Sequence, residues 1–370
     1  MLSKSQIAKP KNDKREGILL ALRKRIVAGE WTPGTQLPIR AELEEQFGVS
    51  GVTMQKALDQ LKLDGFTYGK RRWGTFVTEN PPHLSRYAIV FPSRPGTTSP
   101  WVRFYTALVN AAANLEQSRS RKFPLFYGIE GPSDNDEYQQ LLRDIRHERL
   151  AGLIFPSAPF LLTNSPVLLE PGPPMVAITG PDEPFPQVTP LFLDWGSFIE
   201  KALKYLASRG RHRIAVITAP WEQDKFHKYL VQGLAARNLE TRPYWLQEVS
   251  QHSVKGAKAC VHMLLHGRPD ERPDGLIITD DNLVEYGVAG AVDAGVQLGK
   301  DVDVVAHCNF PWPSPHGMAI KRLGFDAGQL LRRSIEIIDR QRRGEANSDP
   351  ESIPAVFEDE LVLPDGGGGL

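Results

Sequence analysis

The segment from Gln36 to Val77 constrains the fold more than any other part of this 370-residue chain. Pro38 is suited to begin a short helix, because the N–H groups of a first helical turn have no intrahelical partner in any case. Leu43 and Phe47 are spaced to lie on the buried side of that helix. Gly48 follows them and tolerates the left-handed backbone that ends a helix. The first half of the segment therefore predicts one short, amphipathic helix.

A second helix is predicted directly after this one, over about residues 51–62. Ser50 is a good N-cap residue, and Asp64-Gly65 supplies an end signal. Three apolar residues recur at the helical period and predict the buried face: Ala57, Leu58 and Leu61. Two helices joined by a short turn that contains glycine form a helix-turn-helix unit, whose second helix enters the major groove of DNA.

The first turns of the predicted helices and the hairpin behind them give the candidate DNA contacts. The hairpin Tyr68–Val77 is basic and alternating, as expected of a wing laid on phosphates. A helical core domain with a solvated basic loop remains the alternative reading. The candidate contacts on the helices are Arg40, Ser50, Gly51, Thr53, Met54, Gln55 and Lys56, and those on the wing are Lys70, Arg71, Arg72 and Gly74.

Charge is distributed unevenly along the chain. The formal net charge is zero, but residues 1–86 hold 15 Lys and Arg against 9 Asp and Glu. The remaining residues hold 29 against 35, so a basic head precedes an acidic body. This places a positive field where nucleic acid would bind.

Residues 13–78 resemble the winged-helix domain of the GntR family. The spacing of the shared residues is kept throughout, and they are Gly29-Glu-Trp-Thr-Pro-Gly-Thr-Gln-Leu-Pro38, Phe47-Gly-Val-Ser50, Thr53, Ala57-Leu58, Asp64-Gly65 and Gly74-Thr-Phe-Val77. The resemblance implies a winged helix-turn-helix that binds operator DNA.

Departures from that family pattern fall where its members touch DNA. Ala41, Gly51 and Gln55 stand where the family usually has arginine, and the wing tip is Arg72-Trp73-Gly74 rather than Gly-Arg-Gly. Arginine reads guanine through a bidentate contact, whereas glutamine prefers adenine. We therefore expect an operator unlike the usual one for the family, and weaker binding.

From Tyr87 onward, short apolar runs alternate with amphipathic helices. Strands that alternate with helices indicate βαβ units and a mostly parallel sheet, and two successive sets of them indicate two α/β lobes with a cleft between them. The predicted domains are a disordered basic arm over 1–12, the winged helix over 13–78, a Pro-rich linker over 79–86, the α/β body over 87–363 and a flexible tail over 364–370.

The body resembles the LacI-type effector domain, which is itself similar to the periplasmic sugar-binding proteins. The matching segments are Asp194 with Gly210-Arg-His-Arg-Ile-Ala-Val-Ile217, and Asp274-Gly-Leu-Ile-Ile-Thr-Asp-Asp-Asn282 with Gly287, Ala294-Gly295 and Asp303-Val-Val305. The resemblance implies a small polar metabolite in the cleft, a sugar or related compound, together with a homodimer and a transcription regulator that acts as a repressor.

Candidate effector contacts follow from this resemblance and from the strand ends. Asp281 is favoured as a ligand contact and Asp280 as a helix cap, although either residue could serve as the cap. Leu230 replaces an arginine that the family often uses, and Lys228 or His227 is a candidate substitute. Trp101 could stack on a ligand or anchor the core. The predicted effector contacts are Trp101, Phe104, Ser157, Trp221, Lys228, Asp281 and Asn309.

Other chemistry is not favoured by the sequence. Cys260, His262 and His266 have spacing compatible with a shared metal, but a solvated helix face is the preferred interpretation. No phosphate-binding loop, dinucleotide fingerprint or catalytic set is present, so we expect neither an enzyme nor a cofactor. With two cysteines, no signal peptide and no membrane span, the sequence predicts a cytoplasmic protein. The alternative function is a cytoplasmic solute-binding sensor with only non-specific DNA affinity.

Overall fold

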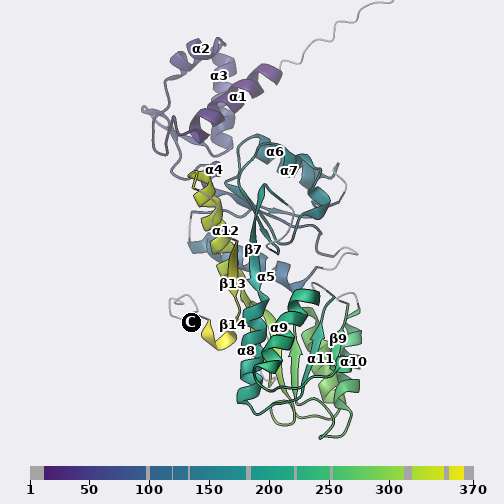
Figure 1. Ribbon diagram of the computed structural model, residues 1–370. Helices are drawn as coiled ribbons and strands as arrows, with labels where there is room; N and C mark the ends of the chain where they lie inside the picture. The colour runs from purple at the N-terminus through teal and green to yellow at the C-terminus, as the bar shows by residue number, and fades with distance from the viewer. Residues whose placement is uncertain are drawn as a thin grey trace, which may run out of the picture.

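The structure is a computed structural model that describes residues 12–96, 101–118, 120–131, 134–180, 185–220, 223–250, 253–311, 319–345 and 350–361. The chain forms an elongated molecule of three parts (Figure 1): a small helical head, a first α/β lobe beside it, and a second α/β lobe at the far end. We call these the head, the N-lobe and the C-lobe. The predicted arm over 1–12 falls almost wholly outside the described residues, as does the predicted tail.

The head is a three-helix unit with a two-stranded wing. Its elements are α1 Asn12–Val27, α2 Arg40–Phe47, α3 Gly51–Leu63, β1 Thr67–Lys70 and β2 Gly74–Val77. The strands pair antiparallel, with Lys70 opposite Gly74. Its core is built from apolar residues of all three helices, including Leu22, Leu43, Met54 and Leu61, each fully buried. The expected winged helix-turn-helix is therefore confirmed.

The turn between α2 and α3 has the backbone that the sequence predicts. Gly48 adopts a left-handed conformation with φ 61°, and its N–H closes the last turn of α2. Ser50 occupies the N-cap position of α3, but its side chain makes no capping hydrogen bond to the backbone. The Ser50 hydroxyl instead hydrogen-bonds the Thr53 hydroxyl at 3.1 Å.

The segment predicted as a linker is packed rather than extended. It contains the short helix α4 Pro82–Ser85, with Pro82 at its first position. His83 is buried and stacks on Phe66 of the head, with ring centroids 5.8 Å apart. The Ser85 hydroxyl donates to the carbonyl of Pro81 at 2.9 Å. This segment is consequently part of the contact between head and body.

The N-lobe is a six-stranded sheet flanked by helices. Its strand order is β13-β7-β6-β5-β3-β4, and all of its pairs are parallel. The elements are β3 Tyr87–Val90, α5 Arg103–Ser118, β4 Leu125–Phe126, α6 Asp136–Arg146, β5 Gly152–Phe155, α7 Pro166–Leu169, β6 Met175–Ile178, β7 Val188–Asp194, α12 Ala327–Arg342 and β13 Glu351–Pro354.

The C-lobe repeats this architecture. Its strand order is β14-β12-β11-β10-β8-β9, parallel except for the short antiparallel pair of β12 with β14. The elements are α8 Trp195–Ser208, β8 Ile214–Thr218, α9 Gln223–Ala235, β9 Leu246–Glu248, α10 Lys255–Leu265, β10 Gly275–Ile278, α11 Asp281–Asp293, β11 Asp303–Phe310, β12 Lys321–Asp326 and β14 Val356–Phe357.

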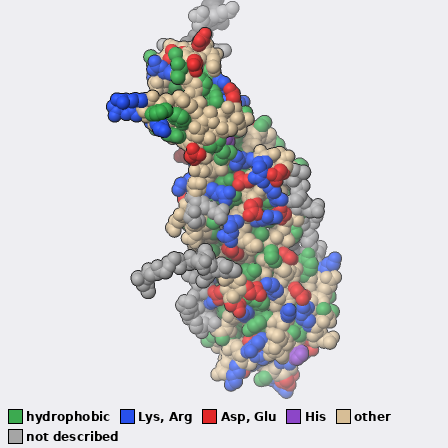
Figure 2. Space-filling model, turned by 90° about the vertical axis from the view of Figure 1, so that its left-hand side faces the viewer, with side chains coloured by type: hydrophobic (Ala, Val, Ile, Leu, Met, Phe, Trp, Pro, Cys, Tyr) green, Lys and Arg blue, Asp and Glu red, His purple; other side chains and the backbone are tan. Residues whose placement is uncertain are grey.

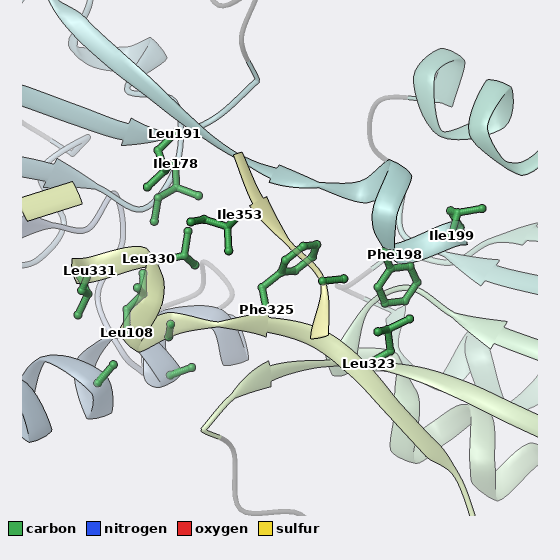
Figure 3. Close-up of a cluster of buried hydrophobic side chains, with 14 of the residues drawn as sticks. Leu108, Ile178, Leu191, Phe198, Ile199, Leu323, Phe325, Leu330, Leu331 and Ile353 are labelled. Atoms are coloured by element: carbon green, nitrogen blue, oxygen red, sulfur yellow. The ribbon is translucent and has the colours of Figure 1, made fainter. Parts of the chain in front are cut away.

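The chain passes between the lobes at three places: from β7 into α8, from β12 into α12, and from β13 into β14. Asp194 and Asp326 cap the helices at the first two crossings, through Ser197 N–H at 3.0 Å and Gly328 N–H at 2.8 Å. One apolar cluster runs across the crossings, with Leu330 and Ile353 on the N-lobe side and Phe198, Leu323 and Phe325 toward the C-lobe (Figure 3). The two-lobed parallel architecture expected from the sequence is confirmed. The four strands at the crossings, β7, β12, β13 and β14, were not predicted.

Candidate functional site

The first candidate site is the exposed start of α3. Residues of α2 and α3 surround a shallow hollow of about 520 Å³, and they are Arg40, Ser50, Gly51, Val52, Gln55 and Lys56. Five of these six are predicted DNA contacts. Thr53 lies beside them and is half-buried. Met54 does not belong to this surface: it is fully buried in the head core, so the expectation that it reads base edges is wrong. The helical period turns its side chain inward with Ala57 and Leu58.

Acidic residues lie beside the side chains that are predicted to contact base edges. The Nε of Arg40 pairs with Glu44 at 2.8 Å, and the amide of Gln55 donates to Asp59 at 2.9 Å. A Cβ atom placed on Gly51 would lie 2.8 Å from the Glu44 carboxylate oxygen. An arginine at position 51 would therefore require Glu44 to move. Because the arginines of the family pattern are replaced here and these carboxylates lie nearby, this face carries less positive charge than the family pattern predicts.

The wing supplies the remaining predicted contacts. Its tip is formed by Arg71, Arg72 and Trp73, all exposed, and Arg72 has a left-handed backbone with φ 68°. The Lys70 ammonium lies 5.4 Å from the centre of the Trp73 ring. The Gln36 amide donates to the Trp73 carbonyl at 2.6 Å, which ties the tip to the rest of the head. Figure 2 shows Lys and Arg side chains projecting from one side of the head, as phosphate binding requires.

The second candidate site is a cavity of about 590 Å³ between the lobes. It lies at the carboxyl ends of strands from both sheets, where ligands bind in parallel α/β folds. Its lining comes from β5, β6 and β7, from the start of α5 and α8, and from the ends of β8, β10 and β11. The residues are Val102, Phe104, Tyr105, Pro156, Ser157, Ile178, Leu193, Trp195, Ala219, Pro220, Ser250, Thr279, Asp280, Asp281, Asn282, His307 and Asn309.

Asp280 and Asp281 have different partners in this cavity. Asp280 caps α11, since its Oδ1 accepts the Asn282 N–H and the Asn282 amide, both at 2.8 Å. Asp281 is 5% exposed, and its Oδ2 accepts from the Asn309 amide at 2.8 Å. Burial raises the pKa of the Asp281 carboxyl, against the opposing effects of His307 and Asn309. The capping role expected for Asp280 is therefore observed.

His307 lies between the cavity and the core of the crossings. Its ring is 7% exposed and packs against Trp195, Phe198 and Phe325, with centroids 5.2 to 5.8 Å away. Among the described residues, neither ring nitrogen has a hydrogen-bond partner. Burial lowers the pKa of His307, although the neighbouring Asp281 and Asp280 act in the opposite direction. Burial thus favours the neutral imidazole.

Four of the predicted effector contacts line the cavity: Phe104, Ser157, Asp281 and Asn309. Trp101 does not. Its indole N–H donates to the Thr106 hydroxyl at 2.9 Å and its ring packs on Phe91, Tyr105 and Tyr127. Of the two roles that the sequence left open for Trp101, its contacts agree with the packing role.

Lys228 and His227 also lie outside the cavity lining, on the exposed surface of α9. Both side chains are exposed, whereas Leu230 is buried. Trp221 lies outside the described residues. The sequence reasoning missed Tyr105, Trp195, Thr279 and His307. Thr279 belongs to the shared segment Asp274–Asn282 and directly precedes Asp280, so its position was a usable signal. His307 lies within β11, and no pattern in the sequence around it indicated that its side chain lines a cavity.

A cluster of charged groups joins the head to the N-lobe. Asp64, at the C-terminal end of α3, pairs with Arg23 of α1 and with Arg149 of the N-lobe, the latter at 2.8 Å. Arg149 also pairs with Asp144 at 3.2 Å. Asp64 is 8% and Arg23 1% exposed, so the cluster is largely desolvated. We refer to Arg23, Asp64, Arg149 and Asp144 as the junction cluster.

Two further findings bear on function. Among the described residues, no helix is long and apolar enough to cross a bilayer. The rings of His262 and His266 stack 5.2 Å apart, and within the described part of the chain no three His, Cys, Asp or Glu side chains gather as metal ligands.

Comparisons with known proteins agree with the geometry. Residues 14–77 match the family described as bacterial regulatory proteins, gntR family, and residues 203–353 match the periplasmic binding protein-like domain. The chain joins a GntR-type DNA-binding domain to a periplasmic-binding-protein-like domain. The first match corresponds to the head, and the second to most of the C-lobe together with α12 and most of β13 of the N-lobe.

The head is also similar to curated regulators. It is 38% identical over 64 residues to the histidine utilization repressor of Klebsiella aerogenes, and 39% identical over 62 residues to the HTH-type transcriptional repressor NagR of Bacillus subtilis. Each match covers 17% of this chain. The chain spans only 27% and 26% of the length of these relatives, so the similarity concerns their DNA-binding parts.

The body is similar in fold to solved structures. A LacI family transcriptional regulator from Lactobacillus casei, with bound glucose, superposes with a TM-score of 0.54 at 17% identity. The match covers 74% of this chain and 98% of that one. Identity this low shows a shared fold and no more.

Proposed function

We propose that this protein is a transcription regulator, acting as a repressor, whose GntR-type head binds operator DNA under the control of a small metabolite. The metabolite would occupy the cavity between the lobes. The observation that carries the proposal is the hollow at the start of α3, where Arg40, Gln55 and Lys56 are exposed. Side chains at this end of a recognition helix reach base edges in the major groove.

The wing supports the same function. Arg71 and Arg72 are exposed at its tip and carry no ion pair among the described residues. Cations of this kind bind phosphates and position the head without reading sequence. A homodimer would present two heads to a pseudo-palindromic operator, one for each half-site.

The cavity supports control by a ligand. Its volume falls within the range of about 300–1,000 Å³ typical of small-molecule sites. The three crossings allow one lobe to rotate against the other, as hinge closure around a ligand requires. Ligand affinity and operator affinity would then be coupled reciprocally.

The test is selection of bound sequences from a random DNA pool by the full chain at near-physiological salt. An inverted repeat should be recovered, and binding should be lost when Gln55 and Arg71 are both replaced by alanine. If no DNA sequence is enriched in any round of selection, operator recognition is excluded.

A second candidate function is a solute sensor with only non-specific DNA affinity. The carboxylates of Glu44 and Asp59 favour it, because they engage Arg40 and Gln55 at the reading face. This candidate predicts a random pool and an affinity that vanishes as salt rises. Replacing Glu44 by glutamine separates the two: a sequence-specific head should keep its preferred repeat and bind it more tightly, whereas a sensor should gain affinity for all sequences alike.

A further inference from the structure

Several donors of the cavity's polar lining are engaged within the chain. The Asn309 amide donates to Asp281, and the Asn282 amide donates to Asp280. The Thr279 hydroxyl donates to the Thr218 hydroxyl at 2.8 Å, which leaves the Thr279 oxygen as an acceptor. The Asp281 carboxylate and the Thr279 oxygen are therefore acceptors that face a ligand in the cavity.

Among the described residues, no lysine or arginine lines the cavity, and none forms an ion pair with the buried Asp281 carboxylate. Arg103, at the start of α5, pairs with Glu285 at 2.9 Å, and its backbone N–H donates to the side chain of Asn282. A buried carboxylate is costly unless it is ion-paired or fully hydrogen-bonded, so a positive group beside Asp281 would stabilise it.

His307 is an independent sign that the cavity takes a polar ligand group. Its ring lines the cavity, and within the described part of the chain both of its buried ring nitrogens are without a hydrogen-bond partner. Buried polar groups nearly always have such a partner. A neutral imidazole offers one acceptor nitrogen, which suits an N–H donor on the ligand.

The remaining wall of the cavity is aromatic. Phe104, Tyr105 and Trp195 line it, and Tyr105 hydrogen-bonds Ser157 through its hydroxyl. The faces of aromatic rings attract positive charge, most strongly when water is excluded. Aromatic rings beside a carboxylate are suited to an organic cation, while two carboxylates disfavour a phosphate or a carboxylate ligand.

We propose that the cavity binds a small organic cation through a protonated amino group, with Asp281 as its ion-pair partner and His307 and Thr279 as further acceptors. This inference rests on the proposed ligand control and names the chemical class of the effector. A protonated amine supplies three N–H donors and no acceptor, which complements the lining described above. Ion pairing to Asp281 would stabilise the ionised form of this buried carboxyl.

The test uses three probe pairs that match in shape and differ in the amine: Tris with pentaerythritol, glucosamine with glucose, and putrescine with 1,4-butanediol. Thermal melting of the full chain and calorimetric titration are measured at millimolar probe, constant ionic strength and about pH 6.5, below the ordinary pKa of an amine. At least one amine should raise the Tm and bind ten-fold or more tightly than its neutral counterpart. A neutral probe that binds as well as its amine, or no shift with any amine, would overturn the inference.

Variants separate the charge of Asp281 from a structural role. Asp281→Asn keeps an acceptor for the Asn309 amide but removes the charge, so it should abolish the preference for amines. It should also raise the Tm of the ligand-free chain, whereas a purely structural Asp281 would make the variant less stable. The control is Asp293→Asn at the opposite, exposed end of α11, where Asp293 pairs with Lys258. This control should keep the amine preference.

The outcome is independent of operator recognition. If amines bind and no DNA sequence is enriched from the pool, the cation-binding cavity is supported and operator recognition is excluded. If an inverted repeat is recovered and only neutral probes bind, operator recognition is supported and the cation-binding cavity is excluded.

Discussion

Gly324 shows how tightly one residue can constrain the crossings between the lobes. It pairs with Cys308 across β11 and β12, and a Cβ atom at this position would lie 1.8 Å from the Cys308 carbonyl oxygen. The obstructing atoms belong to backbone, so the strands would have to separate. We expect Gly324→Ala to destabilise the chain by about 3 kcal/mol or more, measured as a lower urea midpoint.

Gly17→Ala is the matched control for this substitution. Gly17 lies in the middle of α1, and a Cβ atom there would have nothing within 4 Å. Alanine favours helix, so this variant should gain about 0.5–1 kcal/mol. Equal midpoints for the two variants would contradict the contact at Gly324.

His83 should make stability depend on pH. Burial, with a smaller effect of Arg342, lowers its pKa from 6.5 to about 4. Between these values the unfolded state binds more protons than the folded state, so the contribution of His83 is complete above about pH 6.5 and is lost as the pH falls toward 4. The loss amounts to roughly 3 kcal/mol at most.

His83→Phe should flatten this part of the profile of Tm against pH, because phenylalanine keeps the stack on Phe66 but cannot bind a proton. The wild-type and variant curves should lie close together near neutral pH and separate as the pH falls toward 4, where the wild type drops below the variant. Parallel curves between pH 4 and 6.5 would exclude His83 as the group responsible.

At the scale of elements, the junction cluster fixes the end of α3 to the N-lobe. Arg149→Gln removes a partner of both Asp64 and Asp144, which are largely buried. Removing one member of a buried ion pair typically costs about 3–5 kcal/mol, although Arg23 still partners Asp64 here. We therefore expect a loss nearer to about 2 kcal/mol and faster amide hydrogen exchange in α3 and α6.

Arg146→Gln is the control, three residues away. Arg146 pairs with Glu170 on the exposed surface of the same lobe, at 2.6 Å. Exposed pairs contribute about 0–1 kcal/mol, so exchange in α3 should stay as in the wild type. If both variants loosen α3 equally, the junction cluster does not hold the head.

The elements also show what the sequence could predict. Amphipathic helices such as α6 and buried strands such as β5 and β10 follow directly from their apolar patterns, and the structure confirms them. The missed strands lie at the crossings. β12 contains Lys321, Arg322 and Asp326, and β13 is half-exposed, so neither has the continuous apolar run of a central strand. β12 pairs with β11 and β14, and β13 pairs with β7, and local sequence patterns do not encode these pairings.

The same distinction applies to the cavity. Asp281 and Asn309 could be placed because strand ends meet at one edge of a sheet. The unsatisfied state of His307 could not, because it arises only when Trp195, Phe198 and Phe325 close around it.

At the scale of the whole molecule, the basic head on an acidic body predicts a strong salt dependence of DNA binding. Replacing Arg71 and Arg72 together by alanine should reduce the slope of log K against log salt by about two for each head. Arg268→Ala on the C-lobe, where Arg268 is exposed and pairs with Asp270, should leave the slope unchanged. An unchanged slope for the wing variant, measured by filter binding, would show that the wing does not contact phosphates.

The junction cluster has a mechanical consequence for the whole molecule. Because α3 is fixed to the N-lobe through Asp64 and Arg149, the head and the N-lobe would move together as one rigid body that rotates about the three crossings. In a dimer whose subunits contact each other through their C-lobes, a small rotation about the crossings would move both heads and change the distance between the two recognition helices. In a dimer anchored through its N-lobes, the same rotation would leave that distance untouched.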